Sequence, residues 1–184
     1  MANLCSFSML VKGKHDDIAK FYNAMRQNGH IWMGRGADAE IDYDDNFDLE
    51  GHDRATIDGW CKWSIQSALY DNAISMRREP ERWFFGNDVD SMELEFITFV
   101  EASEKWNLEV EIFSEEPGCC FQEHFIVRNG IKEVDECVEW NEHFLGYYET
   151  KEEAEEELEM QITDEEWEND CVQRGGFGLW EFEI

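Results

Sequence analysis

The order of hydrophobic patterns along residues 4–114 constrains the possible folds more than any other feature of the sequence. Apolar and polar residues alternate from Leu4 to Lys12, which is the two-residue period of a half-buried strand. Residues 15–27 instead carry apolar side chains at helical spacing, and Asn28-Gly29 stops that pattern. The same criteria predict strands over 31–43 and 54–65, helices over 66–78 and 90–106, a loop over 79–87, and a strand beginning at 107.

The principal elements follow the order strand, helix, strand, strand, helix, strand, which is the β-α-β-β-α-β motif of ferredoxin-like folds. Residues 107–128 predict two strands joined at Pro117-Gly118, and Asn129-Gly130 is a strong hairpin signal into a strand over 131–140. Capping-box spacing at Asp90/Glu93, Thr150/Glu153 and Thr163/Glu166 predicts three helix starts. The helix that begins at Thr150 would turn Ala154, Leu158 and Ile162 inward, and the alternation over 177–184 predicts a final strand.

No linker or internal repeat interrupts the 184 residues. We therefore predict a single α+β domain over residues 1–184. It has a ferredoxin-like core, an extended antiparallel sheet and acidic C-terminal helices, with residues 146–184 forming a C-terminal extension of helices and a strand.

Charge is the unusual bulk property of the chain, because 44 acidic residues against 15 basic ones give a formal net charge of -29. Self-repulsion on that scale calls for compensation. Three explanations remain open: a basic partner, bound cations, or a saline environment. An anionic surface repels phosphates and anionic lipids, so we expect neither nucleic acid nor a membrane as a direct partner.

Cysteine use predicts reduced thiols in a cytosolic core. The six cysteines have no CxxC spacing, so neither a zinc site nor a disulfide framework is indicated. The first residues lack a basic start followed by an apolar run, and no segment approaches the ~20 apolar residues of a membrane span. Cytoplasmic localisation is the expectation.

Reactive residue types gather in one stretch and invite a test for catalysis: Glu115, Glu116, Cys119, Cys120, Glu123 and His124. A nucleophilic cysteine needs a base within hydrogen-bonding reach, yet Cys120 and His124 would lie ~13 Å apart along a regular strand. We predict no catalytic residue here: the two cysteines pack on opposite faces beside the turn, and Glu115 and Glu116 are solvated. The five histidines share no metal-ligand spacing, so no cofactor is expected.

One acidic run has the spacing of a calcium-binding EF-hand loop, with Asp42, Asp44, Asn46, Asp48, Glu50 and Asp53 at the ligand positions. Phe47 occupies the place of the turn glycine, and Asp53 replaces the bidentate glutamate. Because strands are predicted on both sides, we predict no specific metal site, while loose cation binding stays open. The basic cluster Arg77, Arg78 and Arg82 is predicted to pair with acids of the chain itself.

Several stretches resemble the YubB-like, ferredoxin-like family carried by plasmids and phages. They are WCKWSI ahead of a helix, LEVEIFSEEPGCCFQEH, the NG turn and the DE that follows it, and the similarity covers residues 4–145. The family offers no established catalytic residues to carry over. The resemblance implies a ferredoxin-like fold and a mobile-element origin, and thus the cytoplasm of a bacterial host.

Acid density provides the functional prediction. One run follows a strand and its loop, and the other a helix: Asp38, Glu40, Asp42, Asp44, Asp45, Asp48 and Glu50; Glu152, Glu153, Glu155, Glu156, Glu159, Asp164 and Glu165. A helix so charged carries about one charge per 2 Å of axis, against about one per 1.7 Å for duplex DNA. Along the predicted strand, the acids on one side repeat every ~6.6 Å.

We therefore expect a non-enzymatic inhibitor that presents a nucleic-acid-like acidic surface to a basic nucleic-acid-binding defence nuclease of the host. A Cas effector or a restriction enzyme fits this class, which makes the chain an anti-CRISPR or anti-restriction protein. An acidic cation-binding or salt-adapted protein is the alternative. A hydrolase or transferase using Glu115, Glu116, Cys120 or His124 is a weaker third.

Overall fold

The computed structural model describes residues 4–44, 53–83, 94–116, 118–119, 121–139, 150–158, 161–164 and 167. Its main sheet has the strand order β3-β4-β1-β6-β7-β8, and every neighbouring pair is antiparallel. The strands are β1 (Leu4–Gly13), β3 (Asp38–Tyr43), β4 (Asp53–Lys62), β6 (Glu109–Glu116), β7 (Phe121–Arg128) and β8 (Ile131–Glu139). The predicted α+β class with an extended, mostly antiparallel sheet is thus confirmed.

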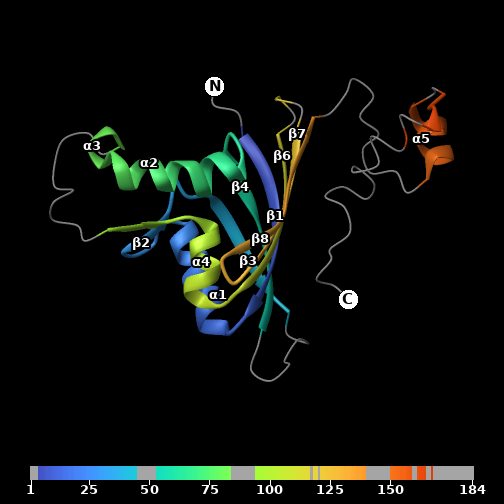
Figure 1. Cartoon of the computed structure of the whole chain (residues 1–184). Helices are drawn as coiled ribbons and strands as arrows, with labels where there is room; N and C mark the ends of the chain where they lie inside the picture. Colours follow the sequence, from blue (N-terminus) through green and yellow to red (C-terminus); the bar gives the residue numbers. More distant parts are fainter. Residues whose placement is uncertain are drawn as a thin grey trace.

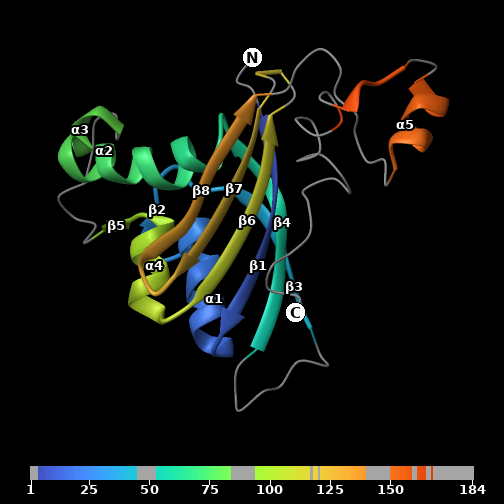
Figure 2. The same ribbon diagram turned by 45° about the vertical axis from the view of Figure 1, so that its right-hand side comes forward.

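Helices cover one face of this sheet (Figures 1 and 2). They are α1 (His15–Met25), a π-helical turn over Gln66–Asp71 that continues into α2 (Asn72–Arg78), and α4 (Phe99–Trp106). The core lies between these layers, where Phe21, Met25 and Phe99 are fully buried together with the inward residues of β1. The alternation and helical spacing of the sequence thus predicted which faces meet.

Two predicted elements are wrong at their boundaries. The single strand predicted over 31–43 is broken at Gly34 and Gly36, whose φ values are +52° and +73°. Its first part, β2 (Ile31–Met33), leaves the main sheet and pairs in parallel with β5 (Glu95–Ile97). Residues 95–97 were predicted to be helical, but their main chain is extended and their pairing with β2 takes up its hydrogen bonds.

The helix predicted over 90–106 begins at Phe99, because Thr98 supplies the cap. Its hydroxyl accepts the amide of Glu101 at 3.1 Å, and the Glu101 carboxylate accepts the amide of Thr98 at 2.8 Å. This reciprocal capping box satisfies two amides that a helix start leaves unpaired. The capping box predicted at Asp90/Glu93 lies outside the described residues. The loop predicted over 79–87 includes a short helix, α3 (Pro80–Trp83).

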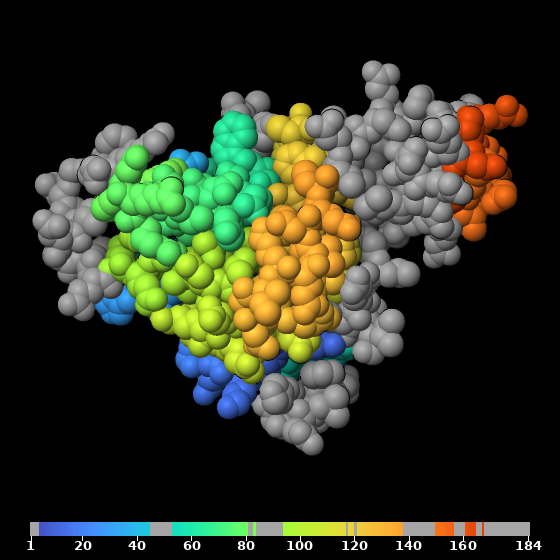
Figure 3. Space-filling model, viewed as in Figure 1, coloured from blue at the N-terminus to red at the C-terminus, as the bar shows by residue number. Residues whose placement is uncertain are grey.

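The predicted hairpins are confirmed. Asn129 and Gly130 both have positive φ, +49° and +81°, as a two-residue turn of this kind requires. β8 therefore returns beside β7, and its residues lie next to those of α4 in Figure 3. Lys132 of β8 places its ammonium 4.7 Å from the ring centroid of Tyr70 and 4.9 Å from that of Phe125, a cation–π contact across the edge of the core.

The C-terminal part contains α5 (Lys151–Leu158), which lies apart from the sheet in Figures 1 and 2. The amide of Glu153 donates to the Thr150 hydroxyl at 3.2 Å, as its capping-box spacing predicted. Ala154 and Ile162 are buried in a small cluster with Trp167, separate from the main core. The predicted strand over 177–184 and the cap involving Glu166 lie outside the described residues. Within the described chain, no helix is long and apolar enough to cross a membrane.

Candidate partner-binding surface

The outer strand β3 carries a row of carboxylates that we call the acidic edge: Asp38, Glu40 and Asp42, with Asp58 of β4. β3 pairs with β4 on one side, and its alternation turns Ala39 and Ile41 toward the core and the acids toward solvent. All four acids are exposed. Glu40 lies directly opposite Asp58 in the strand register, so two like charges share one cross-strand site.

Few cations neutralise the acidic edge. Arg26 lies 4.0 Å from the Asp38 carboxylate, and the Ser8 hydroxyl donates to Asp58 at 2.5 Å. Within the described part of the chain, neither Glu40 nor Asp42 forms an ion pair. A shallow hollow of about 680 Å³ runs along these residues. The edge is therefore a negatively charged surface accessible from solvent.

Asp44, the last acid of the predicted strand run, differs from its neighbours. It is half-buried and accepts hydrogen bonds from the Arg54 guanidinium, so its charge is already compensated. The Asp53 carboxylate likewise lies 2.6 Å from His15 Nδ1, within hydrogen-bonding distance. These two positions of the calcium-like spacing are thus engaged within the protein. Asp45, Asp48 and Glu50 lie outside the described residues.

Helix α5 exposes Glu152, Glu153 and Glu156. Glu155 turns inward and accepts the amide of Ile162 at 2.9 Å, while Asp164 pairs with Lys151 at 2.7 Å. The described parts of the two acidic runs, on β3 and α5, lie apart in both Figure 1 and Figure 2. Glu159 and Glu165 lie outside the described residues.

The turn between β6 and β7 corrects two predictions about the reactive stretch. Cys119 was predicted to pack beside the turn, but it is exposed within it, its amide donating to the Glu116 carbonyl at 3.2 Å. Glu116 was predicted to be solvated, but it is buried, and its carboxylate accepts the Gly118 amide at 3.1 Å. Cys120 lies outside the described residues. Glu115 is half-buried near Ser6 and Gln122, which donate to it at 3.4 Å.

Glu123 is buried on the helical face and serves as a cap. Its carboxylate accepts the amides of Ile65 at 2.8 Å and Gln66 at 3.3 Å, and the Ser114 hydroxyl at 2.7 Å. Burial raises the pKa of Glu123, and these hydrogen bonds oppose that shift. The carboxylate thus satisfies main-chain amides in the first turn of the helix that leads into α2.

His124 points to the opposite face of the sheet, as alternation requires. Its ring stacks on Phe113 with centroids 4.1 Å apart, and its Nε2 lies 3.1 Å from the buried Glu111 carboxylate. Glu123 and His124 therefore lie on different faces and cannot act on one substrate together. No group of three or more histidine, cysteine, aspartate or glutamate side chains in the described chain is arranged to hold a metal ion.

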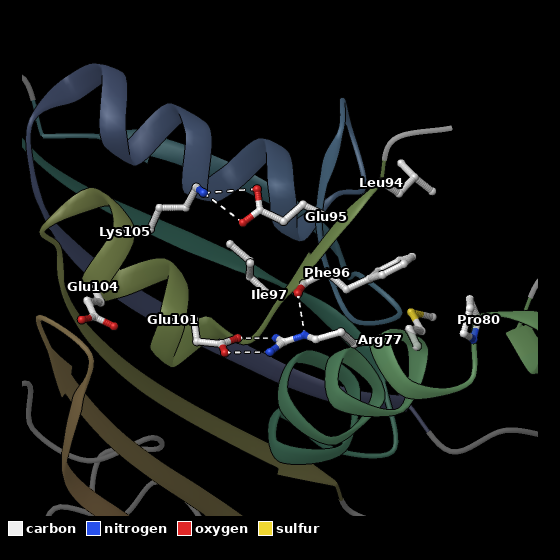
Figure 4. Close-up of a pocket in the computed structure, with 10 residues that line it drawn as sticks. Arg77, Pro80, Leu94, Glu95, Phe96, Ile97, Glu101, Glu104 and Lys105 are labelled. Atoms are coloured by element: carbon white, nitrogen blue, oxygen red, sulfur yellow. Dashed lines mark hydrogen bonds and ion pairs between the residues drawn. The ribbon is translucent and has the colours of Figure 1, made fainter. Parts of the chain in front are cut away.

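A groove of about 780 Å³ between α2, β5 and α4 contains the predicted self-paired arginine (Figure 4). Arg77 donates to both carboxylate oxygens of Glu101, at 3.0 and 2.6 Å, and to the Phe96 carbonyl. Across the same groove Lys105 pairs with Glu95 at 3.0 Å. These charges neutralise each other, so the groove is a structural joint between elements. The prediction for Arg77 is confirmed.

Sequence reasoning missed a second groove, of about 910 Å³, at the end of β4. We call it the tryptophan groove because three indole rings line it together with three cationic side chains: Trp32, Trp60, Trp83, Arg26, Arg35 and Lys62. The sequence carried no local signal for it, since these residues come from four separate segments.

No protein-family model matches the sequence, and no curated protein matches it either. Among solved structures, the chain is similar to a phage SAM lyase in complex with S-methyl-5'-thioadenosine. The two share 11% sequence identity, the match covers 77% of this chain and 95% of that one, and the TM-score is 0.27. A TM-score this low supports no conclusion about fold or function.

Proposed function

We propose that this chain is a non-catalytic inhibitor whose acidic edge occupies the basic nucleic-acid-binding groove of a host defence nuclease. The observation that carries the proposal is the exposure of Asp38, Glu40 and Asp42 on an outer strand. Among the described residues, the ion pair formed by these three acids is the contact of Asp38 with Arg26 at one end of the strand. A Cas effector or a restriction enzyme is the proposed class of target. We further propose that β3-β4-β1-β6 with α1 and α4 form a ferredoxin-like core, since that strand order fits the motif.

The spacing of the acidic edge suits contact with a groove made for phosphates. Its outward acids repeat at ~6.6 Å along the strand, about half the linear charge density of a single DNA strand at one charge per ~3.4 Å. Asp58 of β4 adds a further carboxylate directly opposite Glu40 on the neighbouring strand. The remaining excess of acids, which gives the net charge of -29, accelerates the encounter with a basic partner without forming specific contacts.

A rigid edge favours binding, because less conformational freedom is lost when the complex forms. β3 is hydrogen-bonded to β4 along its length, and Gly59 of β4 permits this close approach. A side chain at Gly59 would overlap the main chain of Asp38 and Ala39. The acids therefore project from a fixed backbone.

Two triple variants that remove equal charge test the proposal. D38N/E40Q/D42N neutralises the edge, and E152Q/E153Q/E156Q neutralises exposed acids of α5. Both are added to plasmid cleavage by a restriction endonuclease and by an RNA-guided nuclease. Exposed ion pairs contribute ~0.2–1 kcal/mol each, so losing three should raise the half-inhibitory concentration of the edge variant about 3- to 150-fold. The α5 variant should stay within about threefold of the unmodified chain.

Equal weakening by both triples would show that bulk charge, not the edge, produces inhibition. Recovery of partners from a bacterial lysate on the immobilised chain covers nucleases outside the cleavage panel. A true target should elute when duplex DNA is added, and the edge variant should fail to retain it. Retention that duplex DNA leaves unchanged would contradict competition for a nucleic-acid groove.

A further inference from the structure

The tryptophan groove has the dimensions of a small-molecule site. Its volume of about 910 Å³ lies within the ~300–1,000 Å³ typical of ligand pockets. Trp60, on β4, is 55% exposed although it is a large apolar side chain. Trp32 and Trp83 approach from β2 and α3, and their indole N–H groups donate to the Gly29 carbonyl at 2.9 Å and the Ser75 hydroxyl at 3.1 Å. Two of the three rings are thus held in place.

The loop after β2 presents Arg35 to this groove from a fixed backbone. Gly34 and Gly36, on either side of it, both have positive φ. The amides of residues 35, 36 and 37 each donate to a main-chain carbonyl inside the protein at 2.9–3.0 Å. These three amides are therefore not available to cradle a phosphate. What it offers a ligand is the guanidinium of Arg35, which lies 4.7 Å from the ring centroid of Trp83.

The groove is positively charged although the chain as a whole is strongly negative. Among the described residues, neither Arg35 nor Lys62 forms an ion pair, and both are exposed. The acid in the lining is Asp38, and Arg26 lies 4.0 Å from it. Two uncompensated cations facing three indoles indicate a ligand that is both anionic and aromatic.

We propose that the tryptophan groove binds a mononucleotide. The base stacks on an exposed indole, as bases do on aromatic side chains of nucleic-acid-binding grooves, and the phosphate pairs with Arg35 and Lys62. A polynucleotide is disfavoured because the acidic edge begins at Asp38, in the wall of the groove, and repels any phosphate placed beyond the first. The size of the ligand is therefore limited by charge.

Calorimetry with AMP tests this inference, with tryptophan fluorescence as a second readout. W60A and R35Q should each weaken AMP binding about tenfold or more, because one removes the stacking surface and the other a phosphate partner. R78Q is the matched control, since Arg78 is exposed on α2 outside the groove. It should bind AMP as the unmodified chain does.

Ligand fragments separate the two halves of the site. Adenosine lacks the phosphate and ribose 5-phosphate lacks the base, so each should bind at least about tenfold more weakly than AMP. Absence of AMP binding at millimolar concentration would overturn the inference, as would unchanged affinity in both W60A and R35Q. Tighter binding of a single-stranded oligonucleotide than of AMP would overturn the limit on ligand size.

These variants are independent of the proposed inhibition. Trp60 is exposed, so W60A should fold, and a melting curve checks each protein. D38N/E40Q/D42N removes negative charge beside the groove and should bind AMP as well as the unmodified chain or better. Weaker AMP binding by that triple would contradict the proposed charge arrangement. Nuclease inhibition and AMP binding should therefore be lost in different variants.

Discussion

Replacing Glu123 with alanine should destabilise the fold by about 3 to 7 kcal/mol, because three hydrogen-bond donors lose their acceptor. The amide of Ile65 and the hydroxyl of Ser114 are buried and lie 2.8 and 2.7 Å from the carboxylate. A buried donor without a partner costs ~1–3 kcal/mol. The amide of Gln66, at 3.3 Å and partly buried, counts at the low end of that range.

The expected loss is measurable by thermal unfolding. For a chain of this size, 1 kcal/mol lowers the melting temperature by ~2–4 °C, so E123A should melt roughly 6 to 28 °C below the unmodified chain. E123Q is the matched variant, since its amide oxygen can still accept from Ile65 and Ser114. Its NH₂ then faces the Gln66 amide, so a loss of only about 1 kcal/mol is expected.

The pH dependence gives a second, independent test of the same carboxylate. Burial raises the pKa of Glu123 in the folded chain, so the folded state favours the protonated form. Its stabilising contribution is complete below the unfolded pKa of ~4.3 and is lost as pH rises through the folded pKa. The unmodified chain should therefore gain stability relative to E123Q when both are measured at pH 4 instead of pH 8.

Comparing the two proteins at each pH cancels the titration of the other acids. A stability difference that did not change with pH would show that burial does not penalise the charge of Glu123. A loss below about 1 kcal/mol in E123A would show that water satisfies the three donors and that the carboxylate does not hold the helix start to the sheet. Urea unfolding at both pH values provides the free energies.

Three further outcomes follow from local geometry. T98A should lose about 1 kcal/mol in urea unfolding because α4 loses its cap, and T98S should retain most of it. G34A should lose about 2 kcal/mol or more, since its φ is +52° and a methyl group would overlap the Ala68 carbonyl oxygen. Iodoacetamide should label exposed Cys119 in the native chain but Cys61 only after unfolding. A hydrogen bond to Cys5 and burial raise the pKa of the Cys61 thiol, which therefore stays protonated and unreactive in the folded chain. Peptide mass spectrometry measures the labelling of both cysteines.

Patterns within a single segment predicted the strands, helices and turns whose buried face or turn geometry is set by that segment's own residues. The alternation of β1 and the Asn129-Gly130 turn needed no information from elsewhere in the chain. β2 and β5 were beyond such reasoning. Each has three residues, too few to show a period, and each is stabilised by pairing with a strand 64 positions away in the sequence.

The start of α4 shows how a competing signal misled the prediction. Phe96, Phe99 and Val100 have helical spacing, which extended the predicted helix toward residue 90. The Thr98/Glu101 pair has the same capping-box spacing as Asp90/Glu93, and it sets the helix start in the structure. A helix can begin at any residue that supplies a cap, so two candidate caps on one apolar run leave the boundary undecided by sequence.

Of the two candidate surfaces, the sequence predicted the acidic edge but not the tryptophan groove. The acids of β3 were predicted to face outward because strand alternation fixes them relative to Ala39 and Ile41. The tryptophan groove depends on the meeting of Trp32, Trp60 and Trp83, which only the tertiary fold brings together. The charge of Asp44 was also mispredicted as free, since its partner Arg54 lies across the acidic loop in sequence.

Net charge is therefore a poor guide to what a particular surface of this chain can bind. The total of -29 argues against a polyanion, whose phosphates would extend over many acids. A single phosphate in the tryptophan groove would experience a different balance of charges. Exposed charges beyond ~8–10 Å are largely screened at physiological salt, whereas Arg35 and Lys62 would be in direct contact with it. Under the proposed charge arrangement, the same chain would repel nucleic acid and still accept one nucleotide, because the ligand would end before it reaches the acidic edge.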